Sequence, residues 1–172
     1  MINGNEVLMR KYPDVEDEQI QSSGLDLKIG ALYELDNEPG VYGLFKDEKK
    51  SHRLVKRLPY DECDNHEECW MLLPNKPYLA EVENEIKISN DSAQAYFPRS
   101  TLLRNGINVY TAWGDAGYNG KLMFLLINHG SMKFYIEKGI RFAQLVDFQV
   151  EGSSKEYDGD YQNDKHKNLD EF

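Results

Sequence analysis

The sequence GDAGYNGKLMFLLI, residues 114–127, joins a glycine-rich turn to a continuous apolar run. A short apolar run bounded by turn signals is typical of a strand buried on both faces. The glycines at 114, 117 and 120 allow tight turns and the close approach of a ligand. Asp115 is the leading candidate for chemistry, because a charge beside a core is costly unless something uses it or pairs with it. The alternative interpretation is an ordinary connecting turn with an exposed aspartate.

Alternating patterns elsewhere predict further strands. Residues 80–88 alternate apolar side chains with charged ones, which indicates a strand with one face buried and one polar face outward. Residues 140–150 repeat apolar side chains at every second position and place Gln144 on the same inward face. A buried glutamine needs partners for its amide, which the backbone or a ligand could supply. A shorter strand is expected at residues 25–29. Short strands between turn signals at 37–40, 128–130 and 137–139 predict an all-β, sandwich or barrel-like fold.

Two short helices are expected, at residues 5–10 and within PRSTLLRNG, residues 98–106. In the second, Pro and Ser mark the start and Gly106 marks the end. A helix that begins with Arg99, Ser100 and Thr101 offers backbone N–H groups, two hydroxyls and a guanidinium at one end, which together suit an anion. A plain capped helix is the alternative.

The bulk composition indicates one globular domain, residues 1–152, and a flexible, charged tail, residues 153–172. The chain has 172 residues, of which 40% are hydrophobic, enough for one core. A net charge of -10 disfavours a general nucleic-acid surface, since phosphates require clustered Lys and Arg. No apolar stretch reaches membrane-spanning length and the first residues lack signal-peptide features, so a cytoplasmic protein without membrane contact is expected.

The acidic run DECDNHEEC, residues 61–69, contains both cysteines of the chain, Cys63 and Cys69, with His66 between them. The spacing is not the usual one of a structural zinc site, and no second Cys or His pair follows. A solvated acidic hairpin loop is therefore favoured over metal binding.

Four segments, in this order, resemble the motifs of the dUTPase and dCTP deaminase superfamily: SSGLDLKIG at 22–30, PRSTLLRNG at 98–106, GDAGYNG at 114–120 and GIRFAQL at 139–145. The resemblance covers roughly residues 19–162. It implies the distorted, jelly-roll-like barrel of dUTPases and a homotrimer whose sites lie between subunits.

The resemblance also implies which reaction is expected. The glycine-rich, arginine-containing fifth motif of common dUTPases is absent, and YDGDYQ at 157–162 instead resembles the closing segment of dCTP deaminases and deaminase-like dUTPases. Arg104 stands where deaminases carry an arginine. Deamination needs a carboxylate to shuttle protons, yet Leu125 occupies the position of the deaminase glutamate. Hydrolysis of dUTP to dUMP and pyrophosphate is therefore expected, keeping dUTP low and supplying dUMP.

By the same resemblance, Asp115 would deprotonate a water that attacks the α-phosphate, and Tyr118 would lie under the deoxyribose and exclude a 2′-hydroxyl. Mg²⁺ would be held mainly by the triphosphate, with no metal site on the protein. The remaining substrate-binding residues would be Arg99, Ser100, Thr101, Trp113, Gln144, Tyr161 and Gln162. The residues that support the substrate-binding network would be Asp26, Arg104 and Arg141.

Some assignments stay open. Trp113 would flank the pocket or pack at a subunit interface, and the hairpin at 107–113 would select the base. Tyr161 and Gln162 would close over the nucleotide once the tail orders. A dCTP deaminase, alone or bifunctional with dUTPase activity, and a catalytically weak nucleotide-sensing regulatory protein are the alternative functions.

Overall fold

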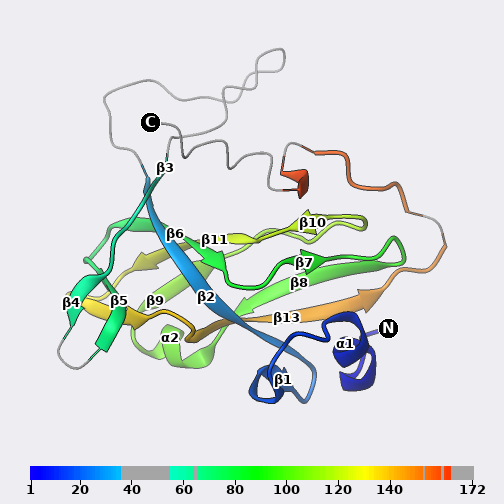
Figure 1. Cartoon of the computed structure of the whole chain (residues 1–172), viewed down its shortest axis with the longest axis horizontal. Helices are drawn as coiled ribbons and strands as arrows, with labels where there is room; N and C mark the ends of the chain where they lie inside the picture. The colour runs from blue at the N-terminus through cyan, green and yellow to red at the C-terminus, as the bar shows by residue number, and fades with distance from the viewer. Residues whose placement is uncertain (36–54, 64–65, 153, 160, 164–172) are drawn as a thin grey trace, which may run out of the picture.

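The computed structural model describes residues 1–35, 55–63, 66–152, 154–159 and 161–163 (Figure 1). The expected turn at 37–40 and the end of the tail beyond residue 163 lie outside the described residues. Strands dominate the chain, so the expected all-β, barrel-like fold is confirmed. In the described ranges, no helix is long and apolar enough to cross a membrane.

The largest sheet has the strand order β8-β13-β2-β6-β11-β9, and β1 and β3 also pair with β2. Thr111 follows β9, and its hydroxyl donates to the Tyr96 carbonyl of β8 at 3.0 Å, which brings the two ends of the sheet together. The sheet therefore forms a nearly closed barrel around the core. Its strands are β1 Ile20–Gln21, β2 Gly24–Leu35, β3 Val55–Arg57, β6 Pro77–Val82, β8 Ser92–Pro98, β9 Ile107–Tyr110, β11 Met123–Asn128 and β13 Arg141–Gln149.

Two small sheets complete the strand arrangement. Strands β7 (Ile86–Lys87) and β10 (Asn119–Gly120) pair beside the main sheet. Strands β4 (Asp61–Cys63), β5 (His66–Leu72) and β12 (Phe134–Glu137) form the other sheet.

Both expected helices are present, as α1 (Asn5–Lys11) and α2 (Ser100–Arg104), and a 3-10 turn, η1, spans Asp17–Gln19. Helix α1 lies against the end of β13 in Figure 1. Leu8 on α1 is fully buried and Leu102 on α2 is 6% exposed, so each helix contributes an apolar side chain to the core.

The expected single strand at 80–88 is wrong in two respects. The chain forms β6 and β7 instead, separated by a bend at residues 83–84. Glu81, expected to face outward, is 6% exposed, because the Tyr33 hydroxyl donates to it at 3.2 Å and Lys121 lies 3.5 Å away. The buried apolar face of the pattern is confirmed.

The expected inward face of β13 is confirmed at Phe142, which is fully buried, but is wrong further along the strand. An irregularity in the pairing with β2 between Arg141 and Ala143 breaks the period-two pattern. Beyond it, Leu145 and Asp147 are fully buried, whereas Gln144, Val146 and Phe148 lie only partly buried on the other face. The sequence pattern placed Gln144 inward because a period-two pattern carries no sign of a bulge.

The apolar run at 122–127 is less deeply buried than expected. In β11, Phe124 and Leu126 are buried, while Met123, Leu125 and Ile127 alternate with them and are half-buried. Strand β2 extends well beyond the expected residues 25–29. The expected hairpin at 107–113 is instead a wide connection, because β9 pairs directly with β11 and residues 111–122 leave the sheet between them.

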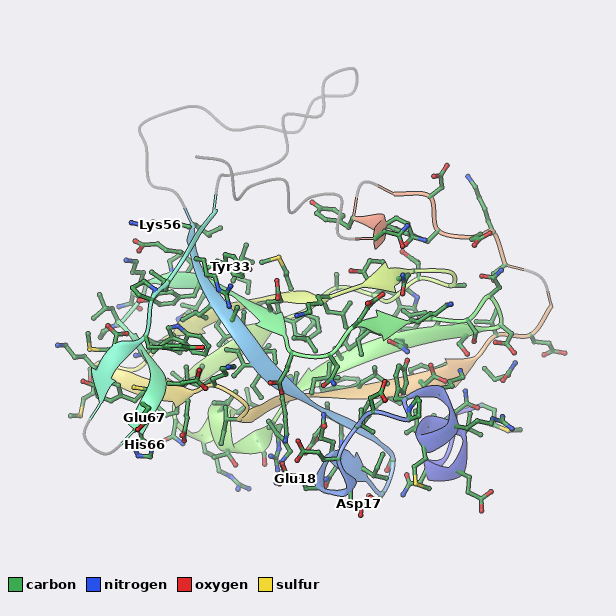
Figure 2. The ribbon with its side chains drawn as sticks, in the orientation of Figure 1. Asp17, Glu18, Tyr33, Lys56, His66 and Glu67 are labelled. Carbon is green, nitrogen blue, oxygen red and sulfur yellow. The ribbon has the colours of Figure 1, made fainter. Side chains whose placement is uncertain are left out.

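In the acidic run, residues 61–63 and 66–69 belong to the paired strands β4 and β5, so the expected hairpin is present and residues 66–68 are exposed, although these residues are strands rather than a loop. Cys69 is 2% exposed and is disulfide-bonded. His66 and Glu67 lie at the end of the molecule opposite α1 (Figure 2). Within the described part of the chain, no group of three or more His, Cys, Asp or Glu side chains could hold a metal ion.

Candidate active site

Asp115 lies on an elbow that is fixed to β8. The N–H of Gly114 donates to the Gln94 carbonyl at 2.8 Å, and the N–H of Gln94 donates back to the Gly114 carbonyl at 2.9 Å. A Cβ on Gly114 would lie 2.4 Å from the Tyr96 hydroxyl, so the elbow tolerates only glycine there. Gly117 has φ +83°, which turns the chain back toward β10. These contacts hold the exposed Asp115 on a closely packed support.

A cleft of about 540 Å³ opens beside Asp115. Trp113, Asp115 and Ala116 line it from the elbow, and residues 154–158 of the tail line it from the other side. Across the described residues, no hydrogen-bond or ion-pair partner holds the Asp115 carboxylate. The carboxylate is therefore available to a molecule in the cleft.

The tail is fixed to the elbow of its own chain. The N–H of Tyr157 donates to the Ala116 carbonyl at 2.9 Å. The Gln162 side chain donates to the Gly117 carbonyl and accepts from the N–H of Asn119, each at 2.9 Å. The tail therefore follows the elbow along β10, as Figure 1 shows. Tyr161 beside it is 43% exposed.

The two aromatic side chains flanking Asp115 differ in exposure. Tyr118 is 8% exposed, its hydroxyl donates to the Lys121 carbonyl at 3.2 Å, and its ring packs edge-on against Tyr157 at 5.6 Å. Trp113 is 58% exposed and stacks on Phe148 of β13 at 5.9 Å. The tail thus covers Tyr118, while Trp113 forms an exposed wall of the cleft.

A second group of polar side chains surrounds Asp26 on β2. Arg99 and Arg141 lie 3.4 and 3.5 Å from its carboxylate, which is 2% exposed. Burial raises the pKa of Asp26 above its ordinary value, and the two guanidinium groups oppose that shift. Arg141 also donates to the carbonyl of Glu18, which lies beside β1 in Figure 2. Two cations therefore share one buried carboxylate.

Further candidate residues lie near these arginines. Gln144 is opposite Asp26 in the β13–β2 pairing and opposite Phe97 in the β13–β8 pairing. The N–H of Arg99 donates to the Phe142 carbonyl at 3.1 Å, which fixes the start of α2 against β13. The exposed residues Ser100, Thr101 and Arg104 lie on α2.

One chain does not bring the two groups together. Gly114 is opposite Gln94, which is opposite Asp147, and Gln144 lies three residues further along β13. At ~3.3 Å per residue and ~4.8 Å per strand, the backbones of the elbow and Gln144 are about 14 Å apart. We refer to the elbow with Asp115 as the first candidate half-site and to the group around Asp26, which includes Gln144, as the second.

Sequence reasoning missed the buried polar residues behind the elbow. Lys11, Gln94 and Asp147 form a connected network, and Gln94 and Asp147 are fully buried. No sequence pattern identified them, because the expected inward face of β13 held Gln144 and not Asp147.

The chain belongs to the dCTP deaminase-like family, whose family model matches residues 3–150. It is 40% identical over 162 residues to the probable deoxyuridine 5′-triphosphate nucleotidohydrolase of Methanothermobacter thermautotrophicus, with 94% of this chain and 99% of the relative covered. It is 30% identical over 161 residues to the deoxyuridine 5′-triphosphate nucleotidohydrolase of Methanocaldococcus jannaschii, with 94% and 98% covered.

Among solved structures, the 2′-deoxycytidine 5′-triphosphate deaminase of Agrobacterium tumefaciens shares the fold. The TM-score is 0.64 at 16% sequence identity, and the match covers 85% of this chain and 47% of that one. At this identity the likeness concerns the fold alone.

Proposed function

We propose that this protein is a dUTP diphosphatase, which hydrolyses dUTP to dUMP and pyrophosphate. Relatives with 30–40% identity over nearly the full chain carry that activity in their names. The observation that carries the proposal is the exposed Asp115 carboxylate on a rigid elbow, facing a cleft large enough for part of a nucleotide.

In this reaction Asp115 orients a water molecule toward the α-phosphorus and accepts a proton from that water molecule. A bond forms between the water oxygen and that phosphorus, while the bond from the α-phosphorus to the bridging oxygen breaks and pyrophosphate leaves. A fixed general base favours such a step because little reorganisation is needed as charge moves. The close packing of Gly114 on β8 supplies this rigidity.

Leu125 argues against deamination. The side chain lies half-buried on β11, opposite Leu79 and Tyr110 in the sheet. No acidic residue occurs between Asp115 and Glu137. A deaminase lacking its proton-shuttling carboxylate would lose a contribution of roughly 10²–10⁴-fold. Together with the resemblance that assigns position 125 to the deaminase glutamate, this absence of an acidic residue favours hydrolysis over the deaminase alternative.

The triphosphate would bind at the second half-site. The side chains of Arg99 and Arg141 are 32% and 27% exposed beside the buried Asp26 carboxylate, so guanidinium N–H groups that do not face Asp26 would bind phosphate oxygens. The Ser100 and Thr101 hydroxyls and the Gln144 amide would add uncharged hydrogen bonds. Arg104, exposed on α2, would support phosphate binding through its positive charge.

Mg²⁺ would reach the site bound to the triphosphate. The ion would be held mainly by phosphate oxygens and water, because Mg²⁺ gives up its water ligands reluctantly. When bound, Mg²⁺ would neutralise part of the charge on the phosphates. Asp115, Arg99 and Arg141 would keep the roles given above.

A homotrimer would combine the two half-sites from neighbouring subunits. Within one chain the half-sites are about 14 Å apart by strand geometry. Large apolar side chains are exposed around both of them: Phe97 at 52%, Leu103 at 50%, Trp113 at 58% and Ile140 at 48%. Apolar exposure of this kind is typical of a surface that meets another protein. Trp113 would then lie beside both the cleft and the interface.

The elbow and tail would select the sugar. Tyr118 is held by Tyr157 and by its bond to Lys121, so its ring cannot move aside easily. Placed under the deoxyribose, a fixed ring would exclude a 2′-hydroxyl by steric conflict. The tail would form one wall of the nucleotide cleft, with Tyr161 and Gln162 near the base and sugar.

The test is incubation of the protein and Mg²⁺ with dUTP, dCTP or UTP, followed by measurement of pyrophosphate and base identity. We expect pyrophosphate from dUTP alone. Conversion of dCTP to a uracil nucleotide would refute the hydrolase assignment in favour of a deaminase. Tight dUTP binding without turnover would instead indicate a nucleotide-sensing protein.

A further inference from the structure

The Asp147 carboxylate is fully buried and bonded on both oxygens. Oδ2 accepts from the Asn3 amide at 2.5 Å and from the Lys11 ammonium at 2.7 Å. Oδ1 accepts from the Gln94 amide at 3.1 Å. The Lys11 side chain is 20% exposed, so its charge is partly desolvated beside Asp147. Asn3, which precedes α1, and Lys11, at the end of α1, thus hold one buried charge.

Gln94 connects this charge to the elbow. Its amide also donates to the Tyr12 hydroxyl and accepts from the Tyr96 hydroxyl at 2.8 Å. Burial raises the pKa of both tyrosines, so their hydroxyls keep their protons. The Gln94 side chain therefore forms all its hydrogen bonds with Tyr12, Tyr96 and Asp147. These three partners fix the orientation of its amide.

The backbone of Gln94 is hydrogen-bonded to Gly114. Its N–H and carbonyl form the two hydrogen bonds, 2.9 and 2.8 Å, that hold the residue before Asp115. The Cβ of Gln94 and the hydroxyl of Tyr96 also set the space against which Gly114 packs. A shift of the Gln94 side chain would therefore be transmitted to the elbow through one short, packed connection.

We infer that Lys11 and Asp147 are positioning residues for Asp115, acting through Gln94 and Gly114. The inference rests on the proposed function, since it assigns the network a role in orienting the general base. Lys11 neutralises Asp147, and Asp147 then holds Gln94 in a single orientation. Gln94 in turn holds the elbow that carries Asp115 through its two backbone hydrogen bonds to Gly114. A misplacement of about 1 Å can cost on the order of 10²-fold in rate.

The experiment compares Lys11→Met, Lys11→Arg and Lys76→Met with the unaltered full-length chain. Lys76 forms an ion pair with Glu34 at similar exposure, 29%, away from the elbow, and serves as the matched control. Two quantities are measured: kcat and KM for dUTP, and hydrogen exchange of the Gly114 amide relative to that of the core residue Leu126. The second readout does not depend on activity.

For Lys11→Met we expect kcat to fall roughly 10- to 100-fold with little change in KM, and Gly114 exchange to rise relative to Leu126. Lys11→Arg should retain most of kcat because it keeps the cation. Lys76→Met should change neither kcat nor the relative exchange of Gly114. A Lys11→Met protein with normal kcat or normal relative Gly114 exchange would overturn the inference.

If Lys11→Met does not fold, Asn3→Ala provides the second test. It removes one donor to Asp147 while keeping the cation, and should shift both readouts in the same direction by less. Unchanged readouts would again overturn the inference. Absence of dUTP hydrolysis by the unaltered chain would refute the proposed function, while Gly114 exchange would still decide whether Lys11 positions the elbow.

Discussion

Replacement of Gly114 by alanine would place a methyl carbon 2.4 Å from the Tyr96 hydroxyl, 2.8 Å from Ile88 Cδ1 and 2.9 Å from Gln94 Cβ. Ordinary contacts begin at 3.4 Å, so the elbow or its neighbours must move by about 1 Å. Tyr96 and Ile88 are 5% and 2% exposed, which leaves them little room to move. The elbow that carries Asp115 is therefore the segment expected to shift.

We expect Gly114→Ala to lose about 1–3 kcal/mol in the free energy of unfolding, the usual cost of overpacking a core. We also expect kcat for dUTP to fall roughly 10- to 100-fold, because the general base moves by about 1 Å. Urea unfolding and steady-state kinetics measure the two effects. Gly4→Ala is the control, since a Cβ there meets nothing within 4 Å. A Gly114→Ala protein with unchanged kcat would show that Asp115 does not depend on this packing.

Two further predictions concern the sugar and the buried carboxylate. Tyr118→Ala should admit UTP as a substrate, whereas Tyr118→Phe, which keeps the ring, should still reject UTP. Continued rejection of UTP by Tyr118→Ala would refute the steric role of the ring. For Asp26, the raised pKa means that the folded chain binds the proton more tightly than the unfolded chain does. The stability of the wild-type chain relative to Asp26→Asn should therefore be greatest at low pH and fall as pH rises from about 3.9, the ordinary Asp value, through the raised pKa. Urea unfolding of both proteins from pH 3 to 7 measures this difference, and a difference that grows with pH would contradict the assigned shift.

The parts of the fold that depend on local sequence could be predicted. The apolar positions of 80–88, the short helix before Gly106 and the all-β class follow from periodicity and turn chemistry. The orientation of β13 could not be predicted, because its bulge depends on pairing with β2, a contact distant in sequence. One irregularity moved Gln144 outward and Asp147 inward.

The sequence named candidate site residues, but it did not show their arrangement. Asp115 and Arg99 were identified from short motifs, whose local geometry a sequence can specify. Their separation along β8, where the elbow pairs with Gln94 and Arg99 follows the end of the strand, is a property of the topology. The support from Lys11, Gln94 and Asp147 was missed for the same reason, since it joins α1, β8 and β13 across more than 130 residues of chain.

The most direct test of the account is hydrolysis of dUTP in ¹⁸O-labelled water by the unaltered chain and by Asp115→Asn, with Mg²⁺ present. Attack on the α-phosphorus predicts that the label enters dUMP and not pyrophosphate. Asp115→Asn should bind dUTP with similar affinity and release almost no dUMP. Label in pyrophosphate, or normal turnover by Asp115→Asn, would contradict an Asp115-activated water acting on the α-phosphorus.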